Sequence, residues 1–197
     1  MAMPAYAKYA KITGERKYLD YAMNSYKWSR DTLANGLFNK KEGLWWRDKD
    51  YVPPYKEKDG SNCYWSRGNG WVYAALVRVM ETLPKTDKYY QYLKKDFILM
   101  SKAILKCQRE DGYWNVSLVC PANYGGPEMT GTGSSSMVWH GAFSRAFFLE
   151  PPTRRRWTRH GRRLPHLFTR MVSSATTRAQ ERSHQPVSQS PSPQSQT

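Results

Sequence analysis

The sequence lacks the apolar signals of a membrane-spanning or exported protein. No apolar run approaches the roughly 20 residues that a membrane-spanning helix requires. The opening stretch, MAMPAYAKYAKITG, has no apolar core behind a basic region, so it is unlike a secretory signal. We therefore expect no membrane partner. We expect a cytoplasmic location, or a periplasmic one if a longer N-terminus carries an export signal.

Cysteine is also scarce in this chain. It has 3 cysteines among 197 residues, at Cys63, Cys107 and Cys120, and no two of them are spaced as CxxC. An odd number of cysteines without that spacing gives no sign of a disulfide framework or of a cysteine-based zinc site. We therefore expect no metal and no cofactor.

Acidic residues are few, with 16 Asp and Glu against 31 Lys and Arg and a net charge of +15. Such an excess first suggests a nucleic-acid partner. The excess is uneven, because residues 1–133 hold 21 basic and 14 acidic residues, whereas residues 134–197 hold 10 arginines, 2 acidic residues and no lysine. The second part is also rich in Ser and Pro. This shift marks either a domain boundary before a disordered tail or a change in the origin of the sequence.

What the first part does contain is a helical pattern. Aromatic residues make up 14% of the chain, too many for a wholly disordered protein. Apolar residues recur at the i, i+3, i+4 spacing of amphipathic helices, while no segment shows convincing strand alternation. This spacing predicts helices at residues 5–12, 15–33, 71–83 and 89–107.

A weak internal repeat accompanies these helices. Two of them are followed by an acidic-Gly-aromatic turn, at Glu42-Gly43 and at Asp111-Gly112. One such unit cannot bury its apolar face alone, so repeated units indicate an α/α toroid or solenoid. An irregular helical bundle is the alternative that this pattern leaves open.

The segment with the most chemistry is YWSRGNGW, at residues 64–71. Its glycines suggest a turn with positive φ that comes close to a ligand. Arg67 offers a planar donor fork suited to a carboxylate, and Trp65 and Trp71 offer flat faces for sugar rings. The alternative is a helix N-terminus with buried aromatic residues. Four more aromatic residues would extend an aromatic rim: Trp45, Trp46, Tyr113 and Trp114.

Several stretches together resemble glycoside hydrolase family 105, the unsaturated rhamnogalacturonyl hydrolases and their unsaturated-glucuronyl relatives. They are YWSRGNGW, the AALVRVMETLP helix, QREDGYWNVSL, NYGGPEMTGT and the opening MAMPAYAKYAKITGERKYLDYA. The resemblance runs from residue 1 to about residue 132. It implies an all-α fold, an incomplete (α/α)6 barrel, in residues 1–132. It also implies removal of a Δ4,5-unsaturated uronic acid from the non-reducing end of pectin-derived (rhamnogalacturonan) or related oligosaccharides.

The resemblance also implies roles for single residues. An Asp of the family protonates the vinyl ether and then assists water addition, as a general acid and base. Trp65, Arg67 and Trp71 match substrate-binding positions, with Arg67 facing the uronate carboxylate. Met1 matches a pocket methionine four residues after the catalytic Asp, so that Asp is expected upstream of Met1 and the chain as written is expected to be inactive. Arg47 stands where some members carry a pocket histidine.

Three other carboxylates lie near these motifs, at Asp48, Asp50 and Asp111. None of them matches the position of the family's catalytic acid. Since Asp commonly stabilises turns, we expect each to be a turn residue.

After residue 132 the resemblance breaks off. The family continues with a helix such as LFVYGMAWGI, whereas this chain continues GSSSMVWHGAF. Back-translation of residues 133–147 with permitted codons, started two bases later, restores LFVYGMAWGIQPGF, and residues 168–178 restore HPDGFLGYDPG in the same shifted frame. We therefore predict a change of coding frame near Thr132. Residues 133–197 would then form a disordered basic tail, and the incomplete barrel would be poorly stable and prone to aggregation.

Two other functions stay open at this point. The Arg-rich run TRRRWTRHGRR at residues 153–163 suits nonspecific phosphate binding, although it lacks a known nucleic-acid-binding module. A noncatalytic carbohydrate-binding protein would use the same Trp65, Arg67 and Trp71. We favour the hydrolase segment, with an unsaturated oligosaccharide as the partner and no nucleic acid. Nothing in the sequence indicates the oligomeric state.

Overall fold

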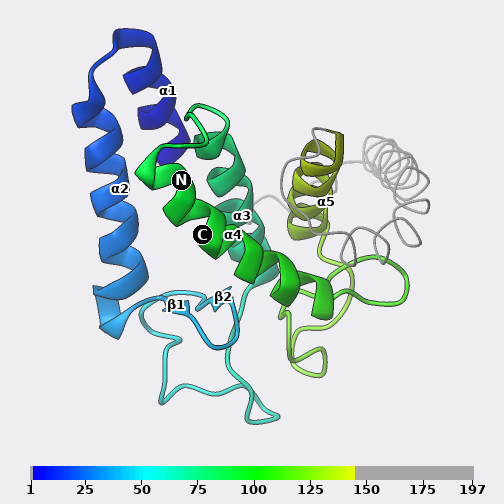
Figure 1. The fold of residues 1–197 in the computed structure, drawn as a ribbon. Coiled ribbons are helices and arrows are strands. Elements are labelled where there is room, and N and C mark those ends of the chain that lie inside the picture. The colour runs from blue at the N-terminus through cyan, green and yellow to red at the C-terminus, as the bar shows by residue number, and fades with distance from the viewer. Residues whose placement is uncertain (1, 145–197) are drawn as a thin grey trace, which may run out of the picture.

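Residues 2–144 are described by a computed structural model, and five α-helices dominate this range (Figure 1). The helices are α1 (Met3–Thr13), α2 (Arg16–Asp31), α3 (Ser66–Met80), α4 (Lys88–Lys106) and α5 (Met129–Ser144). A short 3-10 helix, η1 (Leu33–Asn35), follows α2, and two short strands come next, β1 (Phe38–Asn39) and β2 (Leu44–Trp45). The four helices that the sequence predicts are therefore confirmed, with α3 starting five residues before the predicted residue 71. The predicted disordered tail, from residue 145 on, lies outside the described residues.

Local sequence explains where the helices begin and end. Helix α1 ends at Gly14, whose φ of 75° is the left-handed cap that glycine adopts without strain. Helix α4 begins after Asp87, whose carboxylate accepts a hydrogen bond of 2.8 Å from the backbone N–H of Tyr89. Such an N-cap satisfies one of the free donors of the first turn.

The two acidic-Gly-aromatic turns are present as the repeat predicts. Gly43 and Gly112 both have positive φ, at 72° and 86°. A side chain at Gly43 would also approach the carbonyl oxygen of Leu99 to 2.8 Å, so this turn lies directly on α4. In contrast to the prediction of no strand, β1 and β2 pair in antiparallel register, with Phe38 opposite Trp45. The ladder has two residues on each side, too few for an alternating pattern to be visible in the sequence.

The helices form two layers (Figure 1). Helix α3 contacts α1 on one side and α5 on the other, so α1, α3 and α5 form one row. Helices α2 and α4 each pack on the preceding odd-numbered helix. This arrangement of successive helical hairpins confirms the all-α class. An (α/α)6 barrel contains twelve such helices, so an incomplete ring stays a prediction.

The core lies between the layers and is rich in aromatic rings. Tyr73 on α3 stacks on Phe97 on α4, with ring centroids 4.8 Å apart and planes 5° apart. Trp114 is 1% exposed, and its indole N–H donates to the carbonyl oxygen of Ile104 at 2.7 Å. Trp114 therefore belongs to the core, and its predicted place on an aromatic rim is wrong.

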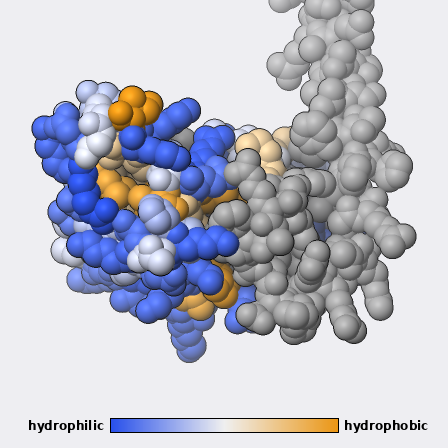
Figure 2. Space-filling view, turned by 45° about the horizontal axis from the view of Figure 1, so that its top comes forward, coloured by the Kyte–Doolittle hydropathy of each residue, from blue (hydrophilic) through white to orange (hydrophobic). Residues whose placement is uncertain are grey.

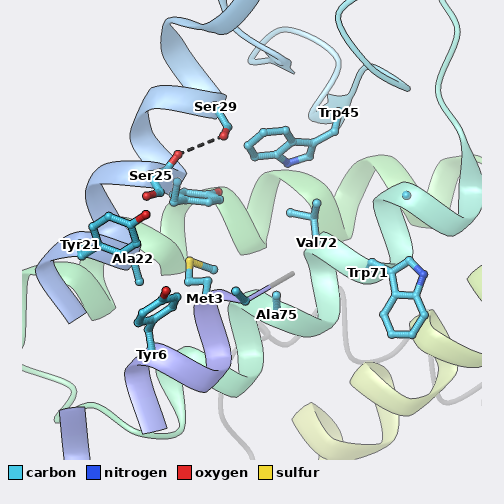
Figure 3. A pocket seen from close by; sticks show the side chains of 13 residues that line it. Met3, Tyr6, Tyr21, Ala22, Ser25, Ser29, Trp45, Trp71, Val72 and Ala75 are labelled. Carbon is cyan, nitrogen blue, oxygen red and sulfur yellow. Dashed lines mark hydrogen bonds between the residues drawn. The ribbon is translucent and has the colours of Figure 1, made fainter. Parts of the chain in front are cut away.

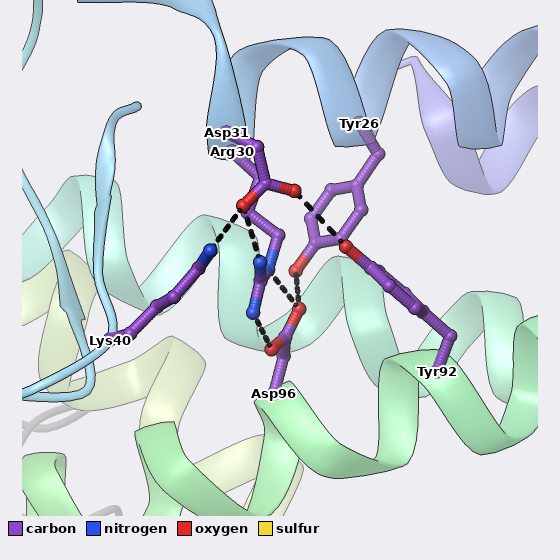
Figure 4. Close-up of polar contacts among 6 residues, drawn as sticks. All are labelled: Tyr26, Arg30, Asp31, Lys40, Tyr92 and Asp96. Atoms are coloured by element: carbon purple, nitrogen blue, oxygen red, sulfur yellow. Dashed lines mark hydrogen bonds and ion pairs between the residues drawn. The ribbon is translucent and has the colours of Figure 1, made fainter. Parts of the chain in front are cut away.

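A set of polar contacts joins α2 to α4 (Figure 4). Arg30 and Tyr26 on α2 both donate to the buried carboxylate of Asp96 on α4. Closer to the hairpin between α1 and α2, the hydroxyl of Tyr89 donates to Asp20 at 2.6 Å. These hydrogen bonds to aspartate carboxylates join α2 and α4, the two helices of the second layer, in addition to apolar packing.

Helix α5 crosses the predicted domain limit between residues 132 and 133. Beyond that limit Ser135 and Val138 are buried, whereas Met137 is 59% exposed. The face of the described residues seen in Figure 2 is mostly hydrophilic, with several apolar groups among the polar ones. Within residues 2–144 none of the helices has the length and apolar composition needed to cross a bilayer.

Candidate functional site

The candidate site is built on the N-terminal turn of α3. Trp65 is the N-cap of this helix and Ser66 is its first residue, so the motif enters the helix directly. Gly68 and Gly70 are helical and do not adopt positive φ, so the predicted positive-φ turn is wrong. The glycine at position 70 has a packing reason instead. A side chain there would approach the backbone of Gly131 on α5 to 3.2 Å, so Gly70 lets α3 and α5 come close together.

Asn69 connects this turn to the small sheet. Its side chain is 2% exposed and forms two hydrogen bonds with the backbone of Trp45, from the Trp45 N–H at 2.9 Å and to the Trp45 oxygen at 3.0 Å. A third bond, of 3.1 Å, goes to the carbonyl oxygen of Trp65. Asn69 therefore fixes Trp45 against the start of α3. The sequence suggests a turn at this asparagine. In the structure Asn69 is helical, and its side chain joins β2 to the start of α3.

Arg67 lies exposed in the first turn of α3. Within residues 2–144 no side-chain hydrogen bond or ion pair involves its guanidinium. In the same range the backbone N–H groups of Arg67 and Gly68 also make no hydrogen bond, as is usual for the first turn of a helix. The positive end of the helix dipole adds to the arginine charge at this point. The first turn of α3 is therefore suited to an anion such as a carboxylate.

Arg47 and Trp65 are part of a continuous series of groups in contact, in which both pairs of rings meet edge to face. We call this series, Tyr55, Tyr51, Arg47, Trp65 and Tyr124, the aromatic ladder. Ring centroids of Tyr55 and Tyr51 are 4.6 Å apart, and those of Trp65 and Tyr124 are 5.1 Å apart. Between them, the guanidinium carbon of Arg47 lies 4.1 Å from the Tyr51 ring centre and 4.9 Å from that of Trp65. The structure thus brings two of the predicted site residues, Arg47 and Trp65, into direct contact.

A pocket of about 520 Å³ lies between α1, α2 and the start of α3 (Figure 3), and Arg47, Trp65 and Arg67 do not line it. Trp71 and Gly68 line it from α3, and Ala2 and Met3 line it from the start of α1. Other residues that line it are Tyr6, Tyr21, Ala22, Ser25, Tyr26, Ser29, Trp45, Val72 and Ala75. Met1, the predicted pocket methionine, lies outside the described residues. Its neighbour Ala2 is nevertheless part of the same pocket as Trp71.

A buried carboxylate holds the loops that carry the aromatic ladder. Glu57 is 4% exposed and accepts hydrogen bonds from the Ser117 hydroxyl at 2.5 Å and from the Asn123 amide at 2.9 Å. Ser117 pairs with Trp65 in an isolated β-bridge, and Asn123 precedes Tyr124. Glu57 therefore connects the loop before Trp65 to the loop that carries Tyr124. Nothing in the sequence pattern distinguishes Glu57 from the exposed charges around it.

Of the three carboxylates near the motifs that the sequence predicts to be turn residues, two accept hydrogen bonds within turns, as predicted. Asp48 accepts from the backbone N–H of Asp50 at 2.9 Å, and Asp111 accepts from that of Tyr113 at 3.1 Å. Asp50 pairs with Lys49 on the surface. In the part of the chain that the structure describes, no group of three His, Cys, Asp or Glu side chains is arranged to hold a metal ion. The basic run at residues 153–163 lies outside that part.

Comparison with known proteins places this arrangement in a family. The profile of the family described as Glycosyl Hydrolase Family 88 matches residues 1–139. A curated relative from Alteromonas sp. (strain LOR), named unsaturated 3S-rhamnoglycuronyl hydrolase, is 37% identical over 137 residues, covering 68% of this chain and 31% of the relative. The chain spans less than half the length of the curated relatives that it matches, 31% and 43%.

Solved structures agree with this assignment. A glycosyl hydrolase family 88 protein from Bacteroides vulgatus is 32% identical with a TM-score of 0.70, over 75% of this chain and 41% of that one. A family 105 glycoside hydrolase from C. acetobutylicum is 25% identical with a TM-score of 0.60, over the same shares of the two chains, 75% and 41%. The resemblance carried by the sequence motifs is thereby confirmed. With 139 of its residues matched, the chain belongs to Glycosyl Hydrolase Family 88.

Proposed function

We propose that this chain is the segment of a Family 88 glycoside hydrolase that binds the unsaturated uronate end of an oligosaccharide. One observation carries the proposal: Arg67 is exposed and unpaired among the described residues, in a helix N-terminus flanked by Trp65 and Trp71. A guanidinium can hold a carboxylate through two parallel hydrogen bonds. Indole faces suit the apolar faces of sugar rings. The pocket that Gly68 and Trp71 line adjoins this helix turn, although Arg67 and Trp65 do not line it, and it would receive a neighbouring part of the oligosaccharide.

The intact protein would then release a Δ4,5-unsaturated uronic acid. A carboxylic acid protonates the vinyl ether carbon C4, water adds at C5, and the hemiketal that forms collapses with release of the sugar. From the resemblance to family 105 we expect this acid upstream of Met1. Near the site, Asp48 is engaged in a turn and Glu57 is buried behind the aromatic ladder. We therefore propose that these 197 residues alone bind the substrate without hydrolysing it.

The names of the relatives support a proposal for the substrate class. Two curated relatives, 37% and 33% identical, are named unsaturated 3S-rhamnoglycuronyl hydrolases. Both names combine an unsaturated uronyl group with rhamnose, as does unsaturated rhamnogalacturonan from pectin. We propose an unsaturated uronate linked to rhamnose as the ligand of this site, with pectin-derived oligosaccharides as the second candidate.

Binding can be measured on the chain as it exists, captured at low density on a biosensor surface. We expect an unsaturated uronyl-rhamnose disaccharide to bind and Arg67→Gln to weaken that binding about tenfold or more, because a hydrogen bond to a charged group contributes about 1.5–3 kcal/mol. Arg78→Gln is the matched control, since Arg78 is an exposed arginine in the last turn of the same helix. Equal effects of the two substitutions would refute the proposal.

The same disaccharide separates binding from catalysis. Hydration at C5 removes the conjugated double bond, and the resulting fall in ultraviolet absorbance measures the reaction. We expect no such fall with this chain. Turnover would show that a general acid lies within the 197 residues. The expectation of inactivity would then be wrong, while the proposed binding role of Arg67 would stand.

We also propose that the barrel segment is residues 1–132 and that the coding frame changes near Thr132. One observation supports this: beyond residue 132 helix α5 buries a serine while exposing Met137. The family match to residue 139 and the match to a curated relative over 80% of the chain extend past this point. Sequencing the gene across this point, together with the intact mass of the expressed protein, tests the proposal. An unbroken frame that the measured mass confirms would refute it.

A further inference from the structure

Helix α4 belongs to the second layer (Figure 1) and has one exposed face. The exposed residues of this helix follow one another at steps of three or four, which places them in a single line along its surface. The line consists of Lys88, Gln91, Lys95, Leu99, Lys102 and Lys106. We call its four lysines the lysine row. The line contains no acidic side chain.

The lysine row is long and its charges are unpaired. With a rise of 1.5 Å per residue, it extends about 27 Å along the helix, and its neighbouring members are about 6–10 Å apart along the axis. Within residues 2–144 none of its four ammonium groups forms an ion pair, since the lysines that do so lie elsewhere. Lys88 lies over the ring of Tyr89, at 5.0 Å from its centre. The row therefore presents four cations to solvent.

The acidic side chains of this helix are engaged by arginines of α2. Asp96 pairs with Arg30, and the N-cap Asp87 pairs with Arg16. Neither carboxylate is therefore free to pair with the lysine row. Glu42 lies near the C-terminal end of the row, where its charge and that of Lys106 act on the pKa of the Cys107 thiol in opposite directions. Glu42 offsets only that end.

The C-terminal half of the row lies next to the small sheet. A side chain at Gly43, between β1 and β2, would approach the carbonyl oxygen of Leu99 to 2.8 Å and the Ala103 side chain to 3.2 Å. The sheet is in turn joined to the start of α3 through the hydrogen bonds between Asn69 and Trp45. The row therefore runs toward the end of the molecule that carries the candidate site, without lining the pocket itself.

A line of unpaired point charges is suited to a linear polyanion. Base readout in duplex DNA uses planar or amide side chains that enter a groove, and single strands bind through aromatic stacking. The line on α4 has no aromatic side chain and no arginine, and Leu99 is its one apolar member. A polysaccharide with an anionic group on successive sugars needs only cations in a row. The membership of the chain in a glycoside hydrolase family also favours a polysaccharide.

We propose that the lysine row binds a linear acidic polysaccharide, a chain of sugars that carry carboxylate or sulfate groups. This inference goes beyond the proposed function, because the contact uses neither Arg67 nor an unsaturated chain end. The binding is electrostatic and depends on several sugars at once. It keeps the polymer close to the protein and so raises the concentration of chain ends near the candidate site.

The test uses the full chain, captured at low density, and an oligomer of polygalacturonate with a saturated non-reducing end. We expect Lys95→Gln combined with Lys102→Gln to weaken binding about threefold or more. Lys8→Gln combined with Lys11→Gln is the matched control, since it removes the same charge from exposed positions on α1 and should leave binding nearly unchanged. The Arg-rich run at residues 153–163 is the same in both variants, so their comparison isolates the lysine row.

Amine labelling gives a second readout on the unsubstituted chain. With polygalacturonate present, acetylation followed by mass spectrometry should slow at Lys95 and Lys102 more than at Lys8 and Lys11. Dextran, a neutral polysaccharide, should protect none of them. The protection should also decline as salt is added, because exposed charges are screened.

Three results would overturn the inference. The first is the absence of polygalacturonate binding, or an equal effect of the two double variants. The second is a lysine row that acetylates equally fast with and without polygalacturonate. The third is a random DNA duplex that protects the row at least as well at the same salt concentration, which would identify a nucleic-acid surface instead.

The outcomes are separate from those of the proposed function. Arg67→Gln should leave binding of the saturated oligomer within about twofold, because this ligand lacks the unsaturated uronate. A larger loss, with the lysine row unprotected, would place the polymer at the start of α3 and refute the inference. The role of Arg67 is tested with the unsaturated disaccharide, whose binding the two lysine substitutions should not change.

Discussion

Arg30 and Asp96 form a two-pronged ion pair that joins the two helices of the second layer (Figure 4). Nε of Arg30 lies 2.7 Å from Oδ2 of Asp96, and Nη2 lies 2.7 Å from Oδ1. The carboxylate is 2% exposed and also accepts a hydrogen bond of 2.9 Å from the Tyr26 hydroxyl. Tyr26 in turn packs on Trp45, with ring centroids 5.5 Å apart, and both residues line the pocket. The ion pair therefore fixes Tyr26, and through Tyr26 it supports the part of the pocket wall that Tyr26 and Trp45 form.

Removal of the Asp96 carboxylate should be strongly destabilising. We expect Asp96→Ala to lower the free energy of unfolding by about 3–5 kcal/mol, because it leaves the largely buried guanidinium of Arg30 without its partner. Urea unfolding at low protein concentration, followed by tryptophan fluorescence, measures this change. Asp50→Ala is the control, since the pair of Asp50 with Lys49 is exposed and should contribute at most about 1 kcal/mol. Similar losses for the two variants would contradict the expectation.

Two glycines in the same helix should respond to alanine with opposite signs. At Gly70 a new methyl group would meet the backbone of Gly131 and the Ser134 side chain at 3.1–3.3 Å, so α3 and α5 must move apart. We expect Gly70→Ala to cost about 1–3 kcal/mol of unfolding free energy. At Gly68 the nearest atom is 4.0 Å away, and alanine favours the helix by about 1 kcal/mol. Urea midpoints that shift in the same direction would contradict this pair of predictions.

The clamp formed by Asn69 should also be measurable. Asn69→Ala removes three side-chain hydrogen bonds and leaves the buried backbone N–H and oxygen of Trp45 without partners. Since an unsatisfied buried polar group costs about 1–3 kcal/mol, we expect a loss of about 2–4 kcal/mol in unfolding free energy. Asn62→Ala is a milder control, because its amide bonds to Glu42 near the surface. Loss of Trp45 packing should appear as a changed tryptophan emission in the folded Asn69 variant alone.

Acid should weaken the contact between α2 and α4 at Asp87. Partial burial alone would raise the pKa of Asp87, but hydrogen bonds from Arg16 and from the Tyr89 N–H outweigh it and lower the pKa below its ordinary value. The folded state therefore binds this proton less tightly than the unfolded state does. Its stabilisation is present above the ordinary Asp pKa of about 4 and is lost as the pH falls through the lower folded pKa.

Urea midpoints recorded between neutral pH and about pH 3 measure this dependence. We expect Asp87→Asn, which keeps an N-cap oxygen, to flatten the decline below about pH 4. A midpoint that rises as the pH falls would contradict the assignment.

The thiols should react slowly while the chain is folded. Burial, together with the nearby Glu57 carboxylate, raises the pKa of Cys63 to about 12. Burial, together with the charge of Glu42, raises the pKa of Cys107 to about 11. Because the thiolate is the reactive form, alkylation at about pH 8 should be slow at both sites and fast in urea. Mass spectrometry of iodoacetamide-treated protein measures this difference, and rapid labelling of Cys63 in the folded chain would contradict the buried position.

Local sequence alone predicts the helices and two of the turns. The apolar spacing in residues 15–33 and 89–107 corresponds to α2 and α4 within one or two residues, because helical hydrogen bonds join neighbours four residues apart. Gly43 and Gly112 adopt the positive φ that the acidic-Gly-aromatic turns require. The start of α3 is predicted five residues too late, since two glycines in eight residues suggest a turn.

The family motifs predict the site residues but not how they meet. Trp65 and Arg67 are neighbours in the chain, so their common place at the start of α3 follows from local structure. The contact between Arg47 and Trp65 joins residues that lie far apart in the sequence, and it depends on loops held together by Glu57. The buried state of Glu57 and of Trp114 has no periodic signal, because each is buried by segments distant in the chain.

The sequence by itself determined the helical class, the family and the two kinds of side chain at the candidate site, aromatic rings and arginine. Those properties depend on the spacing of apolar residues over a few positions and on short sequence motifs. Only the tertiary structure decided that Gly70 serves helix packing, that Asn69 clamps Trp45, and that Arg47 stands stacked and open beside Trp65. Each of these depends on which distant segments pack together, and that is set by the shape and the charges of the folded chain as a whole.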